Sequence, residues 1–174
     1  MLKAQDVVVL LKLASDPGAP WSYPRLALEL EISPSEIHAA VKRAVAAGLA
    51  TKTSSGFQPV RQALEEFLIH GIKYVFAPKR GGPVRGIPTA WAAPPLKDLF
   101  VESNELPPVW PHPEGSVRGI EFSPLYKSAP NAARKDENLY ELLALVDAIR
   151  GGRAREKDLA AKELRARLVP AGKS

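Results

Sequence analysis

The 174-residue chain contains no cysteine, one methionine and only three histidines. Without cysteine it has no disulfide, no thiolate metal site and no cysteine nucleophile, which fits a reducing compartment. His38, His70 and His112 are scattered along the sequence, and none stands at chelate spacing from another histidine or from a cluster of acids. Glycine-rich phosphate loops and nucleophile-elbow patterns are also missing. We therefore expect a chain that is not an enzyme and that holds no cofactor and no metal.

Long hydrophobic runs are missing as well. The apolar stretch from Val7 to Leu11 is bracketed by Asp6 and Lys12, is too short to cross a membrane and lacks a cleavage-site pattern. This predicts a cytoplasmic protein with no membrane partner. The net charge is +5, but residues 1–77 hold eight Lys/Arg against seven Asp/Glu. Composition alone therefore gives only mild support for an anionic partner.

The most informative stretch runs from Ser33 to Arg43 and predicts a helix with a defined start. Ser33 can cap the free backbone N–H groups, Pro34 suits the first helical position, and Glu36 can reach back to complete a capping box. Apolar residues recur at fourfold spacing and predict a buried face: Ile37, Val41 and Val45. Small, polar and cationic residues share another face: Ser35, His38, Ala39 and Lys42, with Arg43 beside them. Short groups that approach base edges and cations that meet phosphates are what a recognition helix needs.

The neighbouring segments extend this pattern. Ser22 can cap a short helix that reaches Leu30, and Gly48 can end the next helix in the left-handed conformation. Two short strands about the turn Ser54-Ser55-Gly56 then predict a hairpin. The segment around Val7 to Ala14 carries the apolar face of a first helix, although the β-branched run Val7-Val8-Val9 also fits a strand.

This order of helices and hairpin resembles the winged-helix regulators of bacteria, loosely those of the MarR type. The resemblance covers roughly residues 3–75 and rests on Leu26-Ala27, Ile32, Ser33 and Ala47-Gly48-Leu49. It implies that helix 33–47 reads the major groove of double-stranded DNA. The residues that the resemblance and the face chemistry assign to DNA are Tyr23, Arg25, Ser33, Ser35, His38, Ala39, Lys42, Arg43, Lys52, Thr53, Ser54 and Ser55. We further expect that replacing Lys42 and Arg43 with alanine weakens DNA binding without unfolding the chain.

The turn before this helix departs from the family pattern at one position. Such turns often carry glycine where this chain has Glu31. A non-glycine residue there adopts a positive φ at some energetic cost, or the turn has another shape.

Residues 78–133 differ in character, because 11 of the 17 prolines lie between Pro78 and Pro130. Proline excludes long helices and central strands from most of this segment. Its tryptophans, phenylalanines and leucines nevertheless require burial, which predicts an ordered, irregular segment that wraps the domain or a partner chain. A repeat, Val84-Arg85-Gly86-Ile87 and Val117-Arg118-Gly119-Ile120, predicts two similar extended elements whose arginines meet carboxylates. Chance competes with this interpretation of four identical residues.

Residues 134–174 predict a helical hairpin. Leu139, Leu142, Leu143, Val146 and Ile149 form one apolar stripe, Gly151-Gly152 ends it, and Leu159, Ala160, Leu164 and Leu168 form a second. Such a hairpin either builds a dimer, which we favour, or covers the domain of its own chain.

The sequence thus predicts a mainly α, α+β chain: a winged helix-turn-helix in residues 1–77, an irregular proline-rich segment in 78–133 and a helix pair in 134–174. The predicted function is a homodimeric, sequence-specific, DNA-binding transcriptional regulator that acts as a repressor. The alternative is a protein-interaction module, such as the antitoxin partner of a toxin that also represses its own operon. Winged helices serve both purposes, so fold alone does not decide between them.

Overall fold

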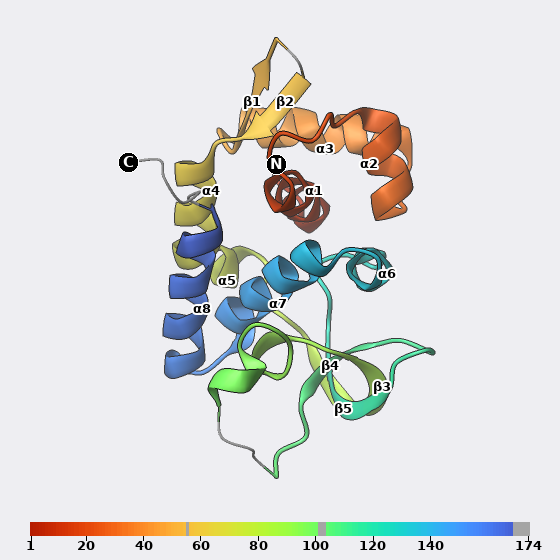
Figure 1. Ribbon diagram of the computed structural model, residues 1–174, viewed down its shortest axis with the longest axis vertical. Coiled ribbons are helices and arrows are strands. Elements are labelled where there is room, and N and C mark those ends of the chain that lie inside the picture. The colour runs from red at the N-terminus through yellow and green to blue at the C-terminus, as the bar shows by residue number, and fades with distance from the viewer. Residues whose placement is uncertain (55, 101–103, 169–174) are drawn as a thin grey trace.

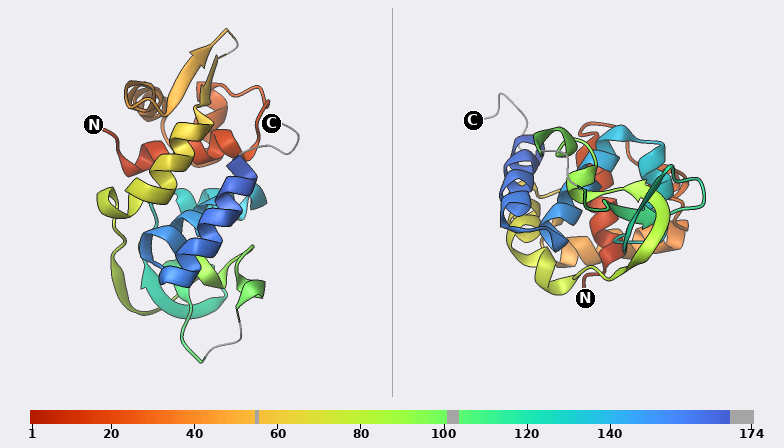
Figure 2. Two further views of the ribbon diagram at one scale, coloured as in Figure 1. Left: turned by 90° about the vertical axis from the view of Figure 1, so that its left-hand side faces the viewer. Right: turned by 90° about the horizontal axis from the view of Figure 1, so that it is seen from below.

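The computed structural model describes residues 1–54, 56–100 and 104–168, and it shows a mainly helical α+β chain (Figure 1). A two-stranded hairpin stands at one end of the long axis and a three-stranded sheet at the other. Two views at right angles agree on this arrangement (Figures 1 and 2). Helices fill the space between the two sheets.

The first part of the chain forms the elements that the sequence predicts. They are α1 (Ala4–Ser15), α2 (Tyr23–Leu30), α3 (Pro34–Ala46), β1 (Ala50–Thr53) and β2 (Gly56–Pro59). The Val7-Val8-Val9 run is helical, because α1 is buried on nearly all sides and its packing outweighs the strand preference of valine. Gly48 ends α3 with φ +78°, in the left-handed region. Glu31 has φ +55°, so the turn keeps the glycine-like geometry without glycine.

The segment after the hairpin is helical up to Val75. The helix α4 (Arg61–Glu66) continues through a π-helical turn (Phe67–Gly71) into α5 (Ile72–Val75). Ile72 and Leu68 are buried on one side, while Tyr74 and Val75 are exposed. The wider π-helical turn rotates the helix so that Ile72 still faces the core.

Residues 78–133 are more regular than predicted. They contain β3 (Arg80–Pro88), β4 (Pro108–Pro111), β5 (Val117–Phe122) and two 3₁₀ turns, Ala90–Ala92 and Lys97–Leu99. Strand β3 pairs antiparallel with β4 and with β5, and β4 pairs parallel with β5, so each strand contacts both others. Pro83 is tolerated because the register between β3 and β5 shifts between Arg80 and Pro83.

The carboxy-terminal part contains α6 (Ala129–Arg134), α7 (Glu137–Gly151) and α8 (Ala154–Leu168). Helix α6 was not predicted, and residues 169–174 of the predicted hairpin lie outside the described residues. Asp136 caps α7 by accepting a hydrogen bond from the backbone N–H of Leu139 at 3.1 Å. The apolar residues of α8, which include Leu164 and Leu168, are buried against the same chain. The hairpin therefore covers its own domain, the alternative to the dimer role that the sequence favoured.

One hydrophobic core joins the three segments. It includes Leu10 of α1, Ile37 of α3 and Leu145 of α7, all fully buried. Helix α1 lies between α3 and α7 in Figure 1 and contacts both. The buried Lys12 strengthens this junction, since its Nζ lies 2.6 Å from Oδ2 of Asp136 and 3.1 Å from Oε1 of Glu29.

A buried polar cluster attaches the three-stranded sheet to α7. The Asp147 carboxylate accepts hydrogen bonds from Thr89 Oγ1 at 2.7 Å, Trp110 Nε1 at 2.8 Å and Arg150 at 2.7 Å. Burial raises the pKa of Asp147, an effect that these three donors oppose. Tyr140 adds a further link by donating from its hydroxyl to the Pro88 carbonyl at 2.6 Å. These contacts fix the sheet to α7.

Among these described residues, no helix is long and apolar enough to cross a bilayer.

Candidate nucleic-acid interface

The start of α3 is built as its sequence predicts. The Ser33 hydroxyl accepts from the Glu36 backbone N–H, and the Glu36 carboxylate accepts from the Ser33 backbone N–H and hydroxyl. These hydrogen bonds lower the pKa of Glu36. The Glu36 carboxylate therefore points toward Ser33 at the start of the helix. Ser33 is exposed but occupied by the cap, so its first role is to start the helix.

The outward surface of α3, here called the α3 face, consists of Ser35, His38, Ala39 and Lys42. Ser35, His38 and Lys42 are exposed and Ala39 is half-buried. On the opposite side, Ile37 and Val41 are buried in the core. Helix α3 lies beside the hairpin at one end of the molecule, remote from α8 and the three-stranded sheet (Figure 1). The α3 face is consequently open to a large ligand.

An aromatic stack connects the α3 face to the neighbouring elements. The Tyr23 ring, at the start of α2, lies 3.6 Å from the His38 ring and 5.0 Å from the Phe57 ring, measured between centroids, and both pairs are stacked. Sequence reasoning named Tyr23 and His38 but missed Phe57. The available signal was the alternation of the apolar Phe57 with the polar Gln58 on β2, which predicts that the Phe57 side chain faces the neighbouring helices. The stack fixes the relative positions of α2, α3 and the hairpin.

Arg43 does not belong to this open surface, contrary to the prediction. Its guanidinium faces α1 and makes two hydrogen bonds of 2.8 Å to the Asp6 carboxylate. The Asp6 side chain is 0% exposed and that of Arg43 is 20% exposed. The hydrogen bonds to Asp6 raise the pKa of Arg43. Among the described side chains, Arg43 is the cation that pairs with the buried Asp6. Arg43 is therefore an internal link between α1 and α3, and turning it toward DNA would leave Asp6 unpaired.

Arg25 is also partly engaged within the chain. Its Nε lies 2.7 Å from Oε2 of Glu29, one helical turn away. Its guanidinium carbon lies 4.3 Å from the centre of the Trp21 ring. The side chain keeps part of its surface exposed, so it can still approach a phosphate.

The β1–β2 hairpin carries the remaining predicted residues. Lys52 and Ser54 are exposed and Thr53 is half-buried, whereas Ser55 lies outside the described residues. The register pairs Lys52 with Phe57 and Thr53 with Gly56, so the turn projects beyond α3 (Figure 1). One exposed cation and two hydroxyl side chains stand at this tip.

The assembled surface therefore offers hydroxyl, imidazole and ammonium groups on α3 and a second ammonium group on the hairpin. Such groups donate hydrogen bonds to phosphate oxygens and to acceptors on base edges. In the part of the chain that the structure describes, no group of three or more His, Asp or Glu side chains is placed to hold a metal ion.

Comparisons with protein-family models, with curated proteins and with solved structures found no significant match for this chain.

Proposed function

We propose that this chain is a double-stranded-DNA-binding regulator whose first 77 residues act as a winged helix-turn-helix. In this proposal α3 enters the major groove and the β1–β2 hairpin is the wing that lies along the phosphate backbone. The observation that carries it is the exposure of Ser35, His38 and Lys42 on one helix face beside the hairpin. A major groove about 12 Å wide accepts one α-helix.

The roles of the individual residues follow from what their side chains are free to do. Ser35 and His38 meet base edges, and Ala39 lets the helix approach closely. Lys42 and Lys52 meet phosphates on either side of the groove. Arg43 has no direct role, because its guanidinium is held by Asp6. The remaining cation, Arg25, contacts a phosphate near the start of α2.

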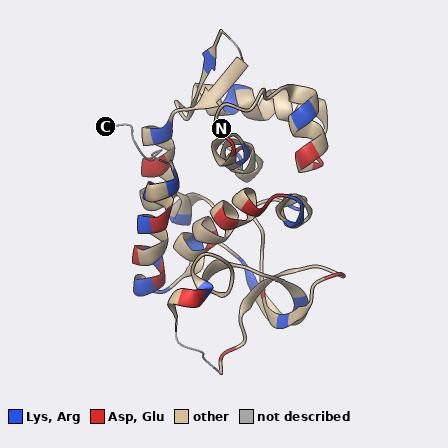
Figure 3. Ribbon diagram, viewed as in Figure 1, with Lys and Arg blue, Asp and Glu red and all other residues tan. Residues whose placement is uncertain are grey.

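Charge on this surface supports binding that is weak for a single chain. Figure 3 shows few basic segments around α3 and the hairpin, compared with the mixture of both signs along α8. Two chains that read two half-sites would multiply the phosphate contacts, which is how helix-turn-helix proteins commonly bind. We propose a homodimeric repressor on this basis. Its contact surface would not be the apolar stripes of α7 and α8, which are buried within the chain.

Selection from a library of random duplexes tests the proposal. The wild-type chain should enrich a defined site, and a recovered palindrome would also report two bound copies. Lys42→Gln should weaken binding to that site about five- to tenfold, because one contact is lost. Lys162→Gln removes one exposed charge from α8 and should leave affinity unchanged. Failure to enrich any sequence, or equal affinity of the Lys42→Gln protein, would overturn the assignment.

A further inference from the structure

The two copies of the Val-Arg-Gly-Ile repeat are partners in the three-stranded sheet. The register of β3 and β5 pairs Val84 with Gly119, Arg85 with Arg118, and Gly86 with Val117. The repeats are therefore related by a local twofold arrangement that is centred on the two arginines. This pairing confirms that the repeat forms two similar extended elements.

The register places Arg85 directly opposite Arg118, a pair of residues here called the arginine pair. Side chains directly opposite one another on antiparallel strands lie on the same face of the sheet. Both arginines are exposed. Like charges in this position destabilise a sheet. A neutral residue in place of either arginine would remove this repulsion, yet the chain has a positive charge at both positions.

The carboxylates that the sequence led us to expect beside these arginines are not found among residues 1–54, 56–100 and 104–168. The ion pairs nearby belong to other arginines, such as Arg134 with Glu114. Glu121 is on β5 but has the opposite side-chain parity from Arg118, and its carboxylate lies against Gly81. The two guanidinium groups are therefore able to pair with an anionic group of another molecule.

Backbone packing holds the arginine pair in place. A Cβ added to Gly86 would overlap the carbonyl oxygen of Trp110, and one added to Gly119 would overlap that of Pro107. The glycine after each arginine thus lets β4 pack against both strands. Trp110 is anchored in turn to Asp147 of α7. The two guanidinium groups start from a rigid support, which lowers the cost of ordering them around a ligand.

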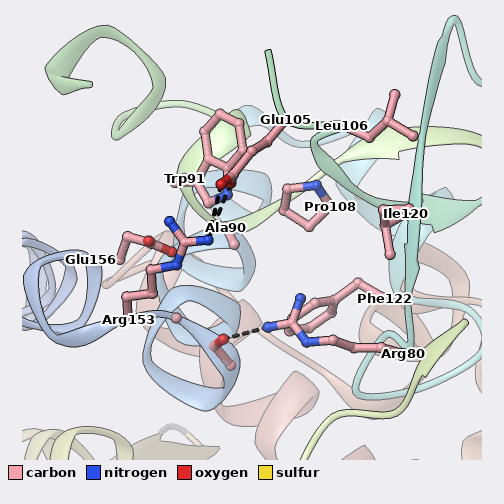
Figure 4. A pocket seen from close by; sticks show the side chains of 12 residues that line it. Arg80, Ala90, Trp91, Glu105, Leu106, Pro108, Ile120, Phe122, Arg153 and Glu156 are labelled. Carbon is pink, nitrogen blue, oxygen red and sulfur yellow. Dashed lines mark hydrogen bonds and ion pairs between the residues drawn. The ribbon is translucent and has the colours of Figure 1, made fainter. Parts of the chain in front are cut away.

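A cavity of about 290 Å³ opens against the same sheet, although neither arginine of the pair lines it. Ile120, two residues from Arg118 and on the same face of β5, lines it with Trp91, Pro108 and Phe122 (Figure 4). Four charged side chains also line the cavity: Arg80, Glu105, Arg153 and Glu156. Arg153 lies 3.1 Å from Glu105, and Arg80 donates to the carbonyl of Gly151. Trp91, Pro108, Ile120 and Phe122 give the cavity an apolar wall against which an apolar side chain can pack.

We propose that this face binds an acidic segment of a partner protein. Two carboxylates of the segment pair with Arg85 and Arg118, and a neighbouring apolar side chain enters the cavity beside Ile120. Arginine forms paired hydrogen bonds with carboxylates, which gives such a contact both direction and strength. This inference does not depend on DNA binding by α3, because the strands β3 and β5, which carry the arginine pair, lie at the opposite end of the molecule from α3 (Figure 1).

A protein segment fits this face better than a nucleic acid. A nucleic acid requires a row of cations that follows its backbone. Within the described part of the chain, the sheet face offers two cations without a partner in the chain, Arg85 and Arg118, since the neighbouring Arg80 and Arg153 have partners. A cavity with one apolar wall, on the same sheet as two exposed cations, matches a segment in which acidic and apolar side chains alternate.

Fluorescence anisotropy with a designed peptide tests this inference. The probe is a labelled ten-residue peptide with four glutamates around a central phenylalanine, titrated with the full chain at low salt. A peptide with glutamine in place of glutamate and a ten-nucleotide single-stranded DNA serve as the other two probes. We expect the acidic peptide to bind about tenfold more tightly than either of them. No binding of the acidic peptide, or tighter binding of the DNA through the same arginines, would overturn the proposal.

Matched charge variants separate the site from general attraction. Arg85→Gln with Arg118→Gln should weaken peptide binding about tenfold. Lys162→Gln with Arg165→Gln removes the same charge from α8 and should leave it unchanged. Equal weakening by both double variants would contradict a specific site. Lys42→Gln should not affect the peptide, so failure of this inference and failure of the DNA-binding proposal give different results.

Thermal unfolding provides a test that is independent of the peptide sequence. Arg118→Gln should raise the melting temperature at low salt, because it relieves the repulsion within the arginine pair, and the difference should shrink at high salt. A lower melting temperature at both salt concentrations would show that Arg118 supports the fold rather than awaiting a ligand.

Discussion

Two adjacent cations of α3, Lys42 and Arg43, have different roles although the sequence treats them alike. Lys42 is exposed, whereas Arg43 is bound to the fully buried Asp6. The helical period explains this difference, because adjacent residues on a helix point about 100° apart. The sequence placed Arg43 at the edge of the contact face. It could not show that an acid from α1 lies on that side.

Single alanine substitutions should separate the two roles. Arg43→Ala should lower the free energy of unfolding by about 3 kcal/mol, because it leaves a buried carboxylate without its partner. Lys42→Ala should change stability by less than about 0.5 kcal/mol. Urea unfolding measures both. Partial recovery of stability when Asp6→Asn accompanies Arg43→Ala would support the pairing, and equal stability of the two single variants would contradict it.

Tyr140 should give stability a distinct dependence on pH. Burial raises its pKa from 10.0 to about 12. Between these values the unfolded chain loses the phenolic proton and the folded chain keeps it. The folded state then binds more protons, so stability falls as pH rises through this interval.

The Tyr140→Phe variant removes this titration. It should begin less stable by about 1 kcal/mol at neutral pH, because the hydrogen bond to Pro88 is lost. Its stability should then fall less steeply than that of the wild type between pH 10 and about 12, as followed by urea unfolding. Parallel curves for the two proteins would show that Tyr140 ionises alike in both states.

At the scale of elements, the sequence predicts the helices better than the sheet. Caps and apolar periods gave α2, α3 and α7 within a few residues of their observed bounds, because these signals are local. The proline content pointed away from strands between Pro78 and Pro130. Closure of β3, β4 and β5 depends on residues far apart in the chain, and the Val-Arg-Gly-Ile repeat was its one visible trace. The candidate site followed the same rule: α3 was predicted, but the Phe57 contact across elements was not.

The glycines of the repeat provide a test of the sheet. Gly86→Ala should destabilise the chain by at least about 3 kcal/mol, because its Cβ would overlap the backbone of β4. Gly82→Ala is the matched control on the same strand, since nothing lies within 4 Å of its added Cβ. Thermal unfolding of both variants measures the difference. Similar melting temperatures would mean that β4 does not pack on β3 as described.

At the scale of the whole molecule, the segment proposed to bind DNA, residues 1–77, shares its hydrophobic core with the rest of the chain. Helix α1 contacts α3 with one side and α7 with the other. Lys12 of α1 is buried between Asp136 and Glu29. The sequence suggested three units in succession because patterns along a chain do not reveal a shared core.

A fragment comprising residues 1–77 should therefore fail to fold, because it would expose the α7-facing side of α1. Circular dichroism and proton NMR should show low helix content or a poorly dispersed spectrum, whereas the full chain unfolds in one cooperative transition. A well-dispersed spectrum and a sharp unfolding transition for the fragment would contradict a shared core.

The central claim is that the α3 face binds duplex DNA, and the salt dependence of binding tests it most directly. Affinity for a selected duplex is measured over a series of salt concentrations for the wild type, Lys42→Gln and Lys162→Gln. The account predicts a slope of log affinity against log salt that is smaller by about one for Lys42→Gln and unchanged for Lys162→Gln. Identical slopes and affinities for all three proteins would contradict it.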